Sequence, residues 1–403
     1  MADNAGGPLT GRLVIDLSRA LAGPHAAMML ADMGARVIKV ESPVGDDSRA
    51  WGPPFVDPND GLPAEATYFL SANRNKESVV LDLKTPADRE VLAALVRRAD
   101  ALIENFRPGV LARLGFGTAE LFELNPRLVL LSITGFGHDG PEALRAGYDQ
   151  IAQGESGLMS VTGSDAQDPQ KVGVPICDLL AGMNGTAGVL AALLDRERTG
   201  RGQIVRTSLL AAGVSVHAFQ GTRWTVGGEL PHPVGNHHPS IAPYGMFRCR
   251  DGAVQMAVGS AHLWVRLCAA FGLDPVDSRF TTNDDRVRNR HELVAVLEDA
   301  FAASSSEDLL AELSLAGLPA GKVRTLDEVY SWDQVHSQGL QITVEHQRLG
   351  SVQLPGPPLR FFDAAEAEIT KRQHEAPPVL DADGADIRAW LSGETSAPVP
   401  ARL

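Results

Sequence analysis

The chain has 403 residues, which is more than one hydrophobic core usually supports, so we expect two domains. Hydrophobic residues make up 44% of the chain and aromatic residues only 5%, a composition that favours an α/β fold over a β-sandwich. The formal net charge of −14 repels nucleic acid and anionic membrane surfaces, so neither is an expected partner. An anionic ligand would therefore need a local cluster of basic groups.

The cysteine content indicates a reduced, cytoplasmic protein. Cys177, Cys249 and Cys268 are far apart and form no CxxC or Cys/His pattern, so neither disulfides nor a metal site are expected. Residues 1–8 contain no basic segment followed by an apolar one, so no secretion signal is expected. No window contains 18 uncharged apolar residues, which predicts that the chain has no membrane span.

Strand and helix patterns alternate through the first half of the chain. Strands alternating with helices predict a parallel sheet in a doubly wound fold. The first strand–helix–strand unit lacks the GxGxxG turn, so a nicotinamide or flavin dinucleotide site is not expected. The predicted strands are 13–17, 36–41, 78–83, 101–104, 127–133 and 204–208, and the predicted helices are 24–33, 85–99, 148–159, 179–194 and 209–219.

A different pattern begins near residue 225, after a crossing rich in glycine and proline. A β-hairpin is predicted over 244–258, with its turn at Asp251–Gly252. Helical patterns follow near 260–271, 290–302 and 306–316, so residues 225–325 are predicted to form a smaller α+β domain. The tail beyond Asp363 is predicted to be an exposed arm with one short helix near 387–391.

Polar residues follow several of the predicted strands. In open parallel sheets, ligands bind in the crevice beyond the carboxyl ends of the strands, so these residues should gather at one edge. The helix that opens at Gly23–Pro24 would present free N–H groups suited to a phosphate. For any single one of these polar or basic residues, a position in a solvated loop is the simpler explanation. The strand-end positions are Ser18–Arg19, Glu41–Ser42, Asn105–Phe106 and Thr134–Gly135, with the basic residues Arg74 and Lys76 just before a strand.

Two aspartates stand near the start of predicted helices. Asp149 follows Gly147–Tyr148, and Asp178 precedes a long helix, so helix capping is the simplest local interpretation of both. Ser156 and Ser208 lack the GxSxG elbow, which disfavours an α/β-hydrolase triad.

The order of several short phrases is more informative than any one of them. These phrases are Leu17–Pro24, Gly34–Glu41, Asn73–Ser78, Glu104–Gly109, Gly147–Asp149 with Gln153 and Gly157, Thr199–Gln203, Gly235–Pro239 and Leu318–Gly321. Together they resemble the class III CoA-transferases, a family that also includes formyl-CoA transferase, carnitine CoA-transferase and the 2-methylacyl-CoA racemases. The resemblance extends from Leu9 to about Pro357.

The resemblance implies a fold and an assembly. Family members are homodimers of two interlocked rings, and each has a Rossmann-like large domain and a smaller domain. It assigns 1–224 to the large, CoA-binding domain, 225–325 to the small domain, and 326–403 to a return segment that completes the large domain and ends as a C-terminal arm. The active site would lie between the large domain of one subunit and the small domain of the other.

The resemblance also implies site residues, with coenzyme A bound as part of an acyl-CoA substrate and no metal. It assigns the covalent nucleophile to Asp149 and an oxyanion or flap role to Gly227 and Gly228. Three positions depart from the pattern of formyl-CoA transferase. Where that enzyme has a histidine, this chain has Arg19, and where it has a basic residue, this chain has Ser42. Its flap has four adjacent glycines, whereas this chain has only Gly227 and Gly228 in that region. The expected CoA contacts are Arg19, Ala20, Ser42, Arg74, Lys76, Asn105, Phe106, Arg113, Leu114 and Thr134.

Tyr148 separates the transferase and racemase branches. Racemases have a histidine immediately before the aspartate, paired with a second aspartate that corresponds to Asp178. Tyrosine, with a reference pKa near 10, is a poor general base at neutral pH. We therefore expect transfer of CoA from a donor acyl-CoA to an acceptor carboxylic acid, through an aspartyl anhydride and an aspartyl-CoA thioester. A racemase and a non-catalytic CoA-binding scaffold are the alternatives.

Overall fold

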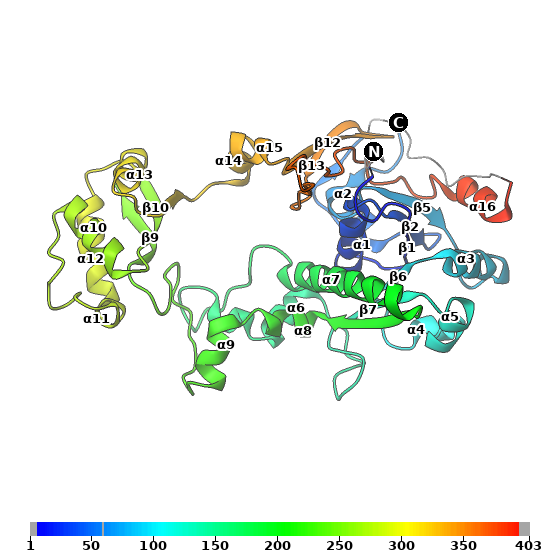
Figure 1. Ribbon diagram of the computed structural model, residues 1–403, viewed down its shortest axis with the longest axis horizontal. Helices are drawn as coiled ribbons and strands as arrows, with labels where there is room; N and C mark the ends of the chain where they lie inside the picture. Colours follow the sequence, from blue (N-terminus) through cyan, green and yellow to red (C-terminus); the bar gives the residue numbers. More distant parts are fainter. Residues whose placement is uncertain (1–5, 59, 395–403) are drawn as a thin grey trace. The chain divides into compact units, whose positions relative to one another are not determined.

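The computed structural model describes residues 6–58 and 60–394, which form two compact units (Figure 1). The larger unit comprises Met1–Leu158, Val172–Ala218 and Asp333–Leu403. The smaller unit comprises Met159–Lys171 and Phe219–Trp332. The smaller unit therefore contains the whole segment 225–325, and it also takes in a short stretch of the first half of the chain.

A six-stranded parallel sheet forms the centre of the larger unit, which confirms the predicted α/β fold. Its strand order is β5-β2-β1-β6-β7-β8, so the chain builds outward from β1 on one side and then from β6 on the other. Val14 pairs with Val37 on one neighbour and with Ala101 on the other. The strands are β1 (Leu13–Asp16), β2 (Arg36–Glu41), β5 (Lys76–Val80), β6 (Ala101–Glu104), β7 (Val129–Thr134) and β8 (Gln203–Ser208).

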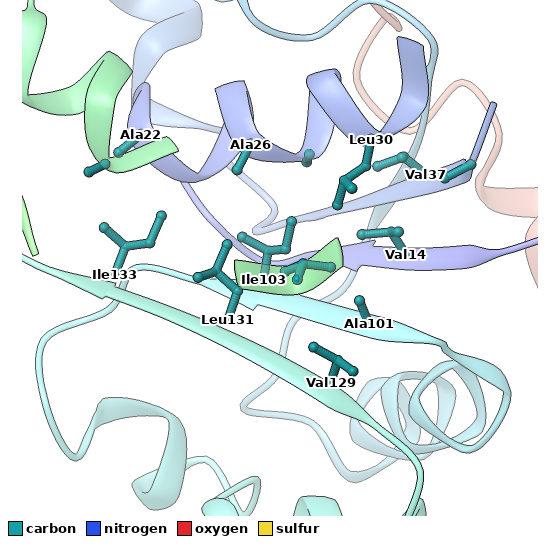
Figure 2. Close-up of a cluster of buried hydrophobic side chains, with 14 of the residues drawn as sticks. Val14, Ala22, Ala26, Leu30, Val37, Ala101, Ile103, Val129, Leu131 and Ile133 are labelled. Carbon is teal, nitrogen blue, oxygen red and sulfur yellow. The ribbon is translucent and has the colours of Figure 1, made fainter. Parts of the chain in front are cut away.

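Helices cover both faces of this sheet, because successive strand side chains point to opposite faces and most of them are apolar. One face, with Val14, Ile103 and Leu131, packs on α1 (Ala22–Asp32) and α7 (Ile176–Thr199) (Figure 2). The other face packs on α3 (Pro86–Arg98), α5 (Thr118–Leu124) and α16 (Gly384–Ser392). Other elements of this unit are α2 (Thr67–Ser71), α4 (Val110–Arg113), α6 (Asp149–Glu155), α8 (Leu209–Ser215), α15 (Asp333–Ser337), a 3-10 helix (Asp47–Ala50), and the strand pairs β3 (Phe55–Val56) with β4 (Glu65–Ala66) and β12 (Gln341–His346) with β13 (Gly350–Pro355).

Helix α7 is long and apolar enough to cross a membrane by length and composition alone, with a mean hydropathy of 1.5 in its most apolar window. Its contacts within the fold account for that composition. It lies along α1, where a Cβ on Gly182 would stand only 2.7 Å from the carbonyl oxygen of Ala22. Glycine at this position therefore lets the two helices approach closely, and α7 serves as a core helix of the larger unit.

The smaller unit has an antiparallel sheet of order β11-β10-β9 with helices packed on it. Its hairpin pairs Tyr244 with Ala257 and Cys249 with Gly252. Its core is lined by side chains such as Phe247, Leu297 and Phe301. The elements are α9 (Ala218–Thr225), β9 (Tyr244–Cys249), β10 (Gly252–Ala257), α10 (Ala261–Phe271), α11 (Asn283–Arg288), α12 (Arg290–Phe301), α13 (Ser306–Leu315), β11 (Ala320–Lys322) and α14 (Leu326–Tyr330), with a 3-10 helix at Leu158–Val161.

The expectations for β5 and for the C-terminal tail are wrong in detail. Strand β5 begins and ends earlier than predicted, because its ladder with β2 runs from Val37–Lys76 to Glu41–Val80 and β2 ends there. The tail is not simply an exposed arm, since α16 buries Ile387 completely against the sheet face that α3 and α5 also cover. The carboxylate of Asp383 also accepts a hydrogen bond from the backbone N–H of Ser78 in β5.

Candidate active site

The loops after β1 and β6 meet where the strand order reverses, which is the place where open α/β sheets bind ligands. The backbone N–H of Arg19 donates to Oδ1 of Asn105 at 2.9 Å, and Nδ2 of Asn105 donates back to the Arg19 carbonyl at 2.8 Å. The Arg19 guanidinium lies 5.8 Å from the ring centroid of Phe106. Four predicted CoA contacts, Arg19, Ala20, Asn105 and Phe106, are therefore brought together at this crevice.

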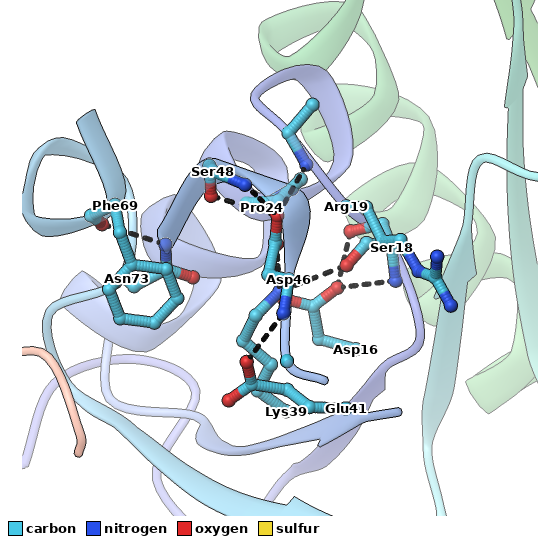
Figure 3. A network of polar contacts seen from close by, with 12 residues as sticks. Asp16, Ser18, Arg19, Pro24, Lys39, Glu41, Asp46, Ser48, Phe69 and Asn73 are labelled. Carbon is cyan, nitrogen blue, oxygen red and sulfur yellow. Dashed lines mark hydrogen bonds and ion pairs between the residues drawn. The ribbon is translucent and has the colours of Figure 1, made fainter. Parts of the chain in front are cut away.

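A buried charge network lies beneath the first of these loops (Figure 3). Lys39 and Lys76 both approach Asp16, and none of the three side chains is exposed. The ammonium of Lys76 donates to Asp16, to the Pro24 carbonyl and to Asn73 at 2.8–2.9 Å, which uses all three of its N–H groups. Burial lowers the pKa of Lys76 to about 8 although Asp16 opposes the shift.

Arg74, just before β5, and Lys76, the first residue of β5, thus face the protein interior. Arg74 forms a bidentate ion pair with Asp32 and also donates to the Pro355 carbonyl at 2.9 Å. Contact of Arg74 or Lys76 with a CoA phosphate would require these hydrogen bonds to break. Their assignment as CoA contacts stays a prediction, but the structure gives both side chains a role in holding the fold.

The remaining predicted contacts are spread over three elements. Ser42 donates to the Gly45 carbonyl at 3.1 Å in the loop after β2. Arg113 is exposed at the end of α4, and Leu114 beside it is half-buried against the sheet cluster. Thr134 ends β7 and accepts a hydrogen bond from the N–H of Gly137 at 3.0 Å.

Thr134 also lines a cavity of about 190 Å³ beyond β6 and β7. Glu104, Ser132 and His138 line the same cavity, and the Ser132 hydroxyl lies 2.7 Å from Nε2 of His138. Ser132 also donates to Glu104, whose carboxyl pKa is raised by burial. Burial lowers the pKa of His138, so a neutral imidazole stands beside this hydroxyl.

Asp149 lies at the start of α6, where two glycines shape the approach of the chain. The Cα atoms of Gly135 and Gly147 are so close that a Cβ on Gly147 would stand 2.6 Å from Gly135. Oδ1 of Asp149 accepts the backbone N–H groups of Cys177 at 2.8 Å and Asp178 at 3.2 Å. Asp149 therefore caps the N-terminus of α7, not that of its own helix, and satisfies two of the N–H groups that a helix start leaves free.

Gln153 completes the surroundings of Asp149. Its side chain is fully buried and its amide donates to Oδ2 of Asp149 at 2.7 Å. The amide oxygen of Gln153 accepts the N–H of Val172 at 2.8 Å, which fixes the orientation of the amide. Both oxygens of Asp149 are thus held by hydrogen-bond donors.

Asp178 has the opposite environment, although it is only one turn into α7. Among the residues that the structure describes, no hydrogen bond reaches its half-buried carboxylate. Burial, and then the negative charge of Asp149, raise the pKa of Asp178 to about 7. One turn later α7 touches the start of α1 through Gly182, so the two aspartates lie next to the crevice after β1.

Tyr68 in α2 belongs to the same site, and no sequence pattern had singled it out. Burial and then the charges of Asp178 and Asp149 raise the pKa of Tyr68 to about 12. The ring packs edge-on against Trp51, with 5.0 Å between ring centroids. The phenol is therefore a protonated hydrogen-bond donor close to two carboxylates.

Gly227 and Gly228 lie in the smaller unit, just after α9. Their N–H groups donate to the carbonyls of Thr222 at 3.2 Å and Trp224 at 3.0 Å, as at the end of a helix. Gly228 has a φ of 68°, a left-handed backbone that suits glycine. An oxyanion role would need both N–H groups to be released, and it stays a prediction.

A doubly wound sheet with a pair of aspartates, Asp149 and Asp178, near its switch point is the frame in which the comparisons with known proteins can be placed. Residues 9–384 match the family described as CoA-transferase family III. The succinate–glutarate CoA-transferase of Agrobacterium fabrum is 42% identical, over 84% of this chain and 85% of that relative. The acetyl-CoA:oxalate CoA-transferase of Acetobacter aceti is 37% identical, over 95% of both chains.

A solved structure agrees with this relationship. The crystal structure of a CaiB/BaiF family protein from Brucella suis superimposes with a TM-score of 0.84 at 40% identity, covering 96% of this chain and 100% of that one. The chain belongs to CoA-transferase family III and is a class III CoA-transferase.

Proposed function

We propose that the protein transfers CoA from a donor acyl-CoA to an acceptor carboxylic acid by way of covalent aspartyl intermediates, with Asp178 as the nucleophile. The observation that carries the assignment is the contrast within the aspartate pair. Asp149 has both oxygens held by N–H donors, whereas the Asp178 carboxylate has no hydrogen bond within the described residues. A carboxylate without donors is the stronger nucleophile, because no hydrogen bond has to break before it attacks. Asp149, which the family resemblance assigns as the nucleophile, is the alternative, and the experiment below distinguishes the two residues.

The reaction would run in four steps. The aspartate oxygen attacks the thioester carbonyl of the donor, forming a mixed anhydride and releasing CoA thiolate. The thiolate attacks the aspartyl carbonyl, which releases the donor acid and leaves an aspartyl-CoA thioester. The acceptor carboxylate then attacks this thioester, giving a second anhydride and free thiolate. The thiolate finally attacks the acceptor's acyl carbon, releasing the new acyl-CoA and restoring the aspartate.

Two neighbouring groups and the partial burial of Asp178 would support these steps. Asp149 fixes the first turn of α7 and so fixes the backbone that carries Asp178. Tyr68 offers a phenol that stays protonated at working pH and can donate to a developing oxyanion. Partial burial of Asp178 limits access of water, which would hydrolyse either intermediate.

Dicarboxylic acids are the substrate class that we propose. The relatives include the succinate–glutarate enzyme of Agrobacterium fabrum and succinyl-CoA:glutarate CoA-transferases of mouse and human, 38% and 36% identical. Succinyl-CoA is therefore the donor to test first, with glutarate, mesaconate and oxalate as acceptors.

Peptide mass spectrometry after incubation with succinyl-CoA would test the proposal. Lys171 separates the two aspartates, so trypsin places Asp149 and Asp178 in different peptides, 146–171 and 172–196. Reduction of the thioester with borohydride converts the modified aspartate into a stable alcohol. We expect the mass change in peptide 172–196, whereas a change confined to 146–171 would return the nucleophile to Asp149. No adduct and no transfer across the acceptor panel would reject the function itself.

A carboxyl group with a pKa of about 7 is also suited to removing an α-proton, so the racemase alternative deserves its own test. A racemase needs a second acid–base group, and the Tyr148 side chain that stands in place of histidine is 64% exposed. Incubation of 2-methylacyl-CoA in D₂O without an acceptor should therefore give no deuterium at the α-carbon.

We further propose that the enzyme is a homodimer in the cytoplasm. Apolar side chains on and after α9 support this assembly, since Trp224, Val226 and Leu230 are 55–84% exposed. Light scattering coupled to size-exclusion chromatography would test it, and a mass near 43 kDa would contradict it.

A further inference from the structure

The loop between β1 and α1 has a strained backbone at its centre. Ala20 has a φ of 66°, in the left-handed region that side-chain-bearing residues rarely adopt. A residue remains in this conformation only where its surroundings enforce it, and such residues gather at functional sites. Ala20 lies in the crevice at the switch point, so the groups that enforce its conformation bear on ligand binding.

Asp46, from a distant loop, supplies the hydrogen bond at Ala20 itself. Its Oδ1 accepts the Ala20 N–H at 3.1 Å, together with the N–H and hydroxyl of Ser48 at 2.9 and 2.8 Å. Its Oδ2 contacts the Lys39 ammonium at 2.8 Å. Both oxygens of this buried carboxylate are thus occupied, one by the loop and one by a buried cation.

Two further contacts hold the same loop from other sides. Lys39 donates to the Ser18 carbonyl at 2.9 Å, two residues before the strained position. Asn105 bonds both the N–H and the carbonyl of Arg19, which ties the loop to the far side of the crevice. The three consecutive residues Ser18, Arg19 and Ala20 are therefore each held through their backbone.

We propose that Asp46 is a positioning residue that keeps Ala20 in its left-handed conformation, so that the crevice is already shaped for acyl-CoA before the ligand arrives. The inference rests on the proposed function, because it assumes that acyl-CoA binds at this crevice. A preformed loop lowers the free energy that binding must spend on ordering the chain. Loss of the Asp46 contact should therefore weaken acyl-CoA binding and leave the chemical steps unchanged.

The variant Asp46→Asn changes the shape of the side chain little but cannot keep the contacts to Ala20 and Lys39 at the same time. An amide has one acceptor oxygen, whereas Asp46 uses two, so asparagine cannot accept from Ala20 and Lys39 together. We expect the KM for succinyl-CoA to rise about tenfold and kcat to stay within about twofold. Asp47→Asn is the matched control, since Asp47 is the adjacent, exposed residue and the change in charge is the same. It should leave both constants unchanged.

The decisive measurement is rescue by Ala20→Gly. Glycine adopts positive φ without steric strain, so in the Asp46→Asn background it should return the KM to within about threefold of the wild type. If Asp46 merely supported folding, Asp46→Asn would lower kcat and thermal stability as well as raise KM, and glycine at position 20 would not restore them. If Asp46→Asn does not fold, Ser48→Ala, which removes the hydroxyl partner of the same oxygen, takes its place with the same rescue.

Three outcomes separate the claims. An unchanged KM in folded Asp46→Asn, or failure of the glycine to restore it, overturns the positioning role while the wild-type enzyme still transfers CoA. A raised KM with glycine rescue supports the positioning role. Absence of transfer in the wild type rejects the proposed function instead, and that result is read from the wild type alone.

Discussion

The crevice after β1 and the aspartate pair at α7 are neighbouring regions with opposite electrostatics. At the crevice, burial alone would raise the pKa of Asp16, but Lys76 and Lys39 reverse the effect and lower it. At the pair, nothing offsets burial, and the charge of Asp149 adds to it, so the pKa of Asp178 rises to about 7. The buried charges around Asp16 therefore stabilise the fold, whereas the charge of Asp178 destabilises it.

The largest expected effect comes from removing the destabilised charge. Asp178→Asn should reduce transfer by at least about a thousandfold, because the amide cannot form an anhydride. It should also raise stability at pH 8 by roughly 2–4 kcal/mol, since the folded state no longer has to ionise a buried carboxyl. Initial-rate assays and urea unfolding would measure the two effects.

The sign of the stability change depends on pH. The unfolded Asp178 ionises near pH 4 and the folded one near 7, so the unfolded state releases its proton first as the pH rises. The penalty is absent below about pH 4, grows towards pH 7 and is constant above it. The advantage of Asp178→Asn should therefore disappear in acid, and an equal advantage at pH 4 and pH 8 would contradict the assignment of this raised pKa.

Breaking the stabilising network should have the opposite effect on the fold. Lys76→Met removes a fully buried cation that binds Asp16, Asn73 and the Pro24 carbonyl. Removal of one partner from a buried ion pair costs about 3–5 kcal/mol, and we expect a loss of stability in that range. Urea unfolding would measure it, with Lys84→Met in the exposed turn before α3 as the control. A loss below about 1 kcal/mol would show that Lys39 alone can hold Asp16.

A smaller effect is expected at Tyr68. Tyr68→Phe keeps the ring that packs on Trp51 and removes only the hydroxyl. If this phenol donates to the oxyanion, kcat should fall about tenfold to a hundredfold with little change in stability. Initial rates with succinyl-CoA would show it. An unchanged kcat would leave the oxyanion to other donors, including the N–H groups predicted at Gly227 and Gly228.

The elements of the sheet could be predicted from the sequence, whereas the roles of the two aspartates could not. The predicted strands 36–41 and 101–104 match β2 and β6 to the residue, because the β-branched and aliphatic residues of a largely buried strand leave a local pattern. Helix α7 was expected from 179 but begins at Ile176, since its cap is Asp149, which lies 28 residues before Cys177. No local pattern records a cap supplied from so far away.

Distant partners also explain why the roles of Arg74 and Lys76, at the start of β5, could not be predicted from the sequence. Arg74 and Lys76 were predicted to contact CoA because they are basic residues just before a predicted strand and because the family resemblance implies it. Their buried partners, Asp32 and Asp16, lie 42 and 60 residues earlier, so only the folded chain shows that both cations are used internally. Tyr68 was missed altogether, because its relation to the aspartates arises from folding and not from spacing.

The smallest expected effect, a shift in the pH dependence of the transfer reaction, distinguishes the roles of Asp178 and Asp149. If the ionised Asp178 is the nucleophile, kcat/KM in the free enzyme should rise with pH and level off above about 7, the pKa that burial and Asp149 impose. Asp149→Asn removes the second of these causes but leaves burial, which is the larger one. The midpoint should therefore move to lower pH by a fraction of the total shift, while one amide oxygen remains to cap α7. If Asp149→Asn stays active and its midpoint moves to lower pH, Asp178 is the nucleophile. If Asp149 were the nucleophile, the variant would be inactive and would have no pH dependence to measure.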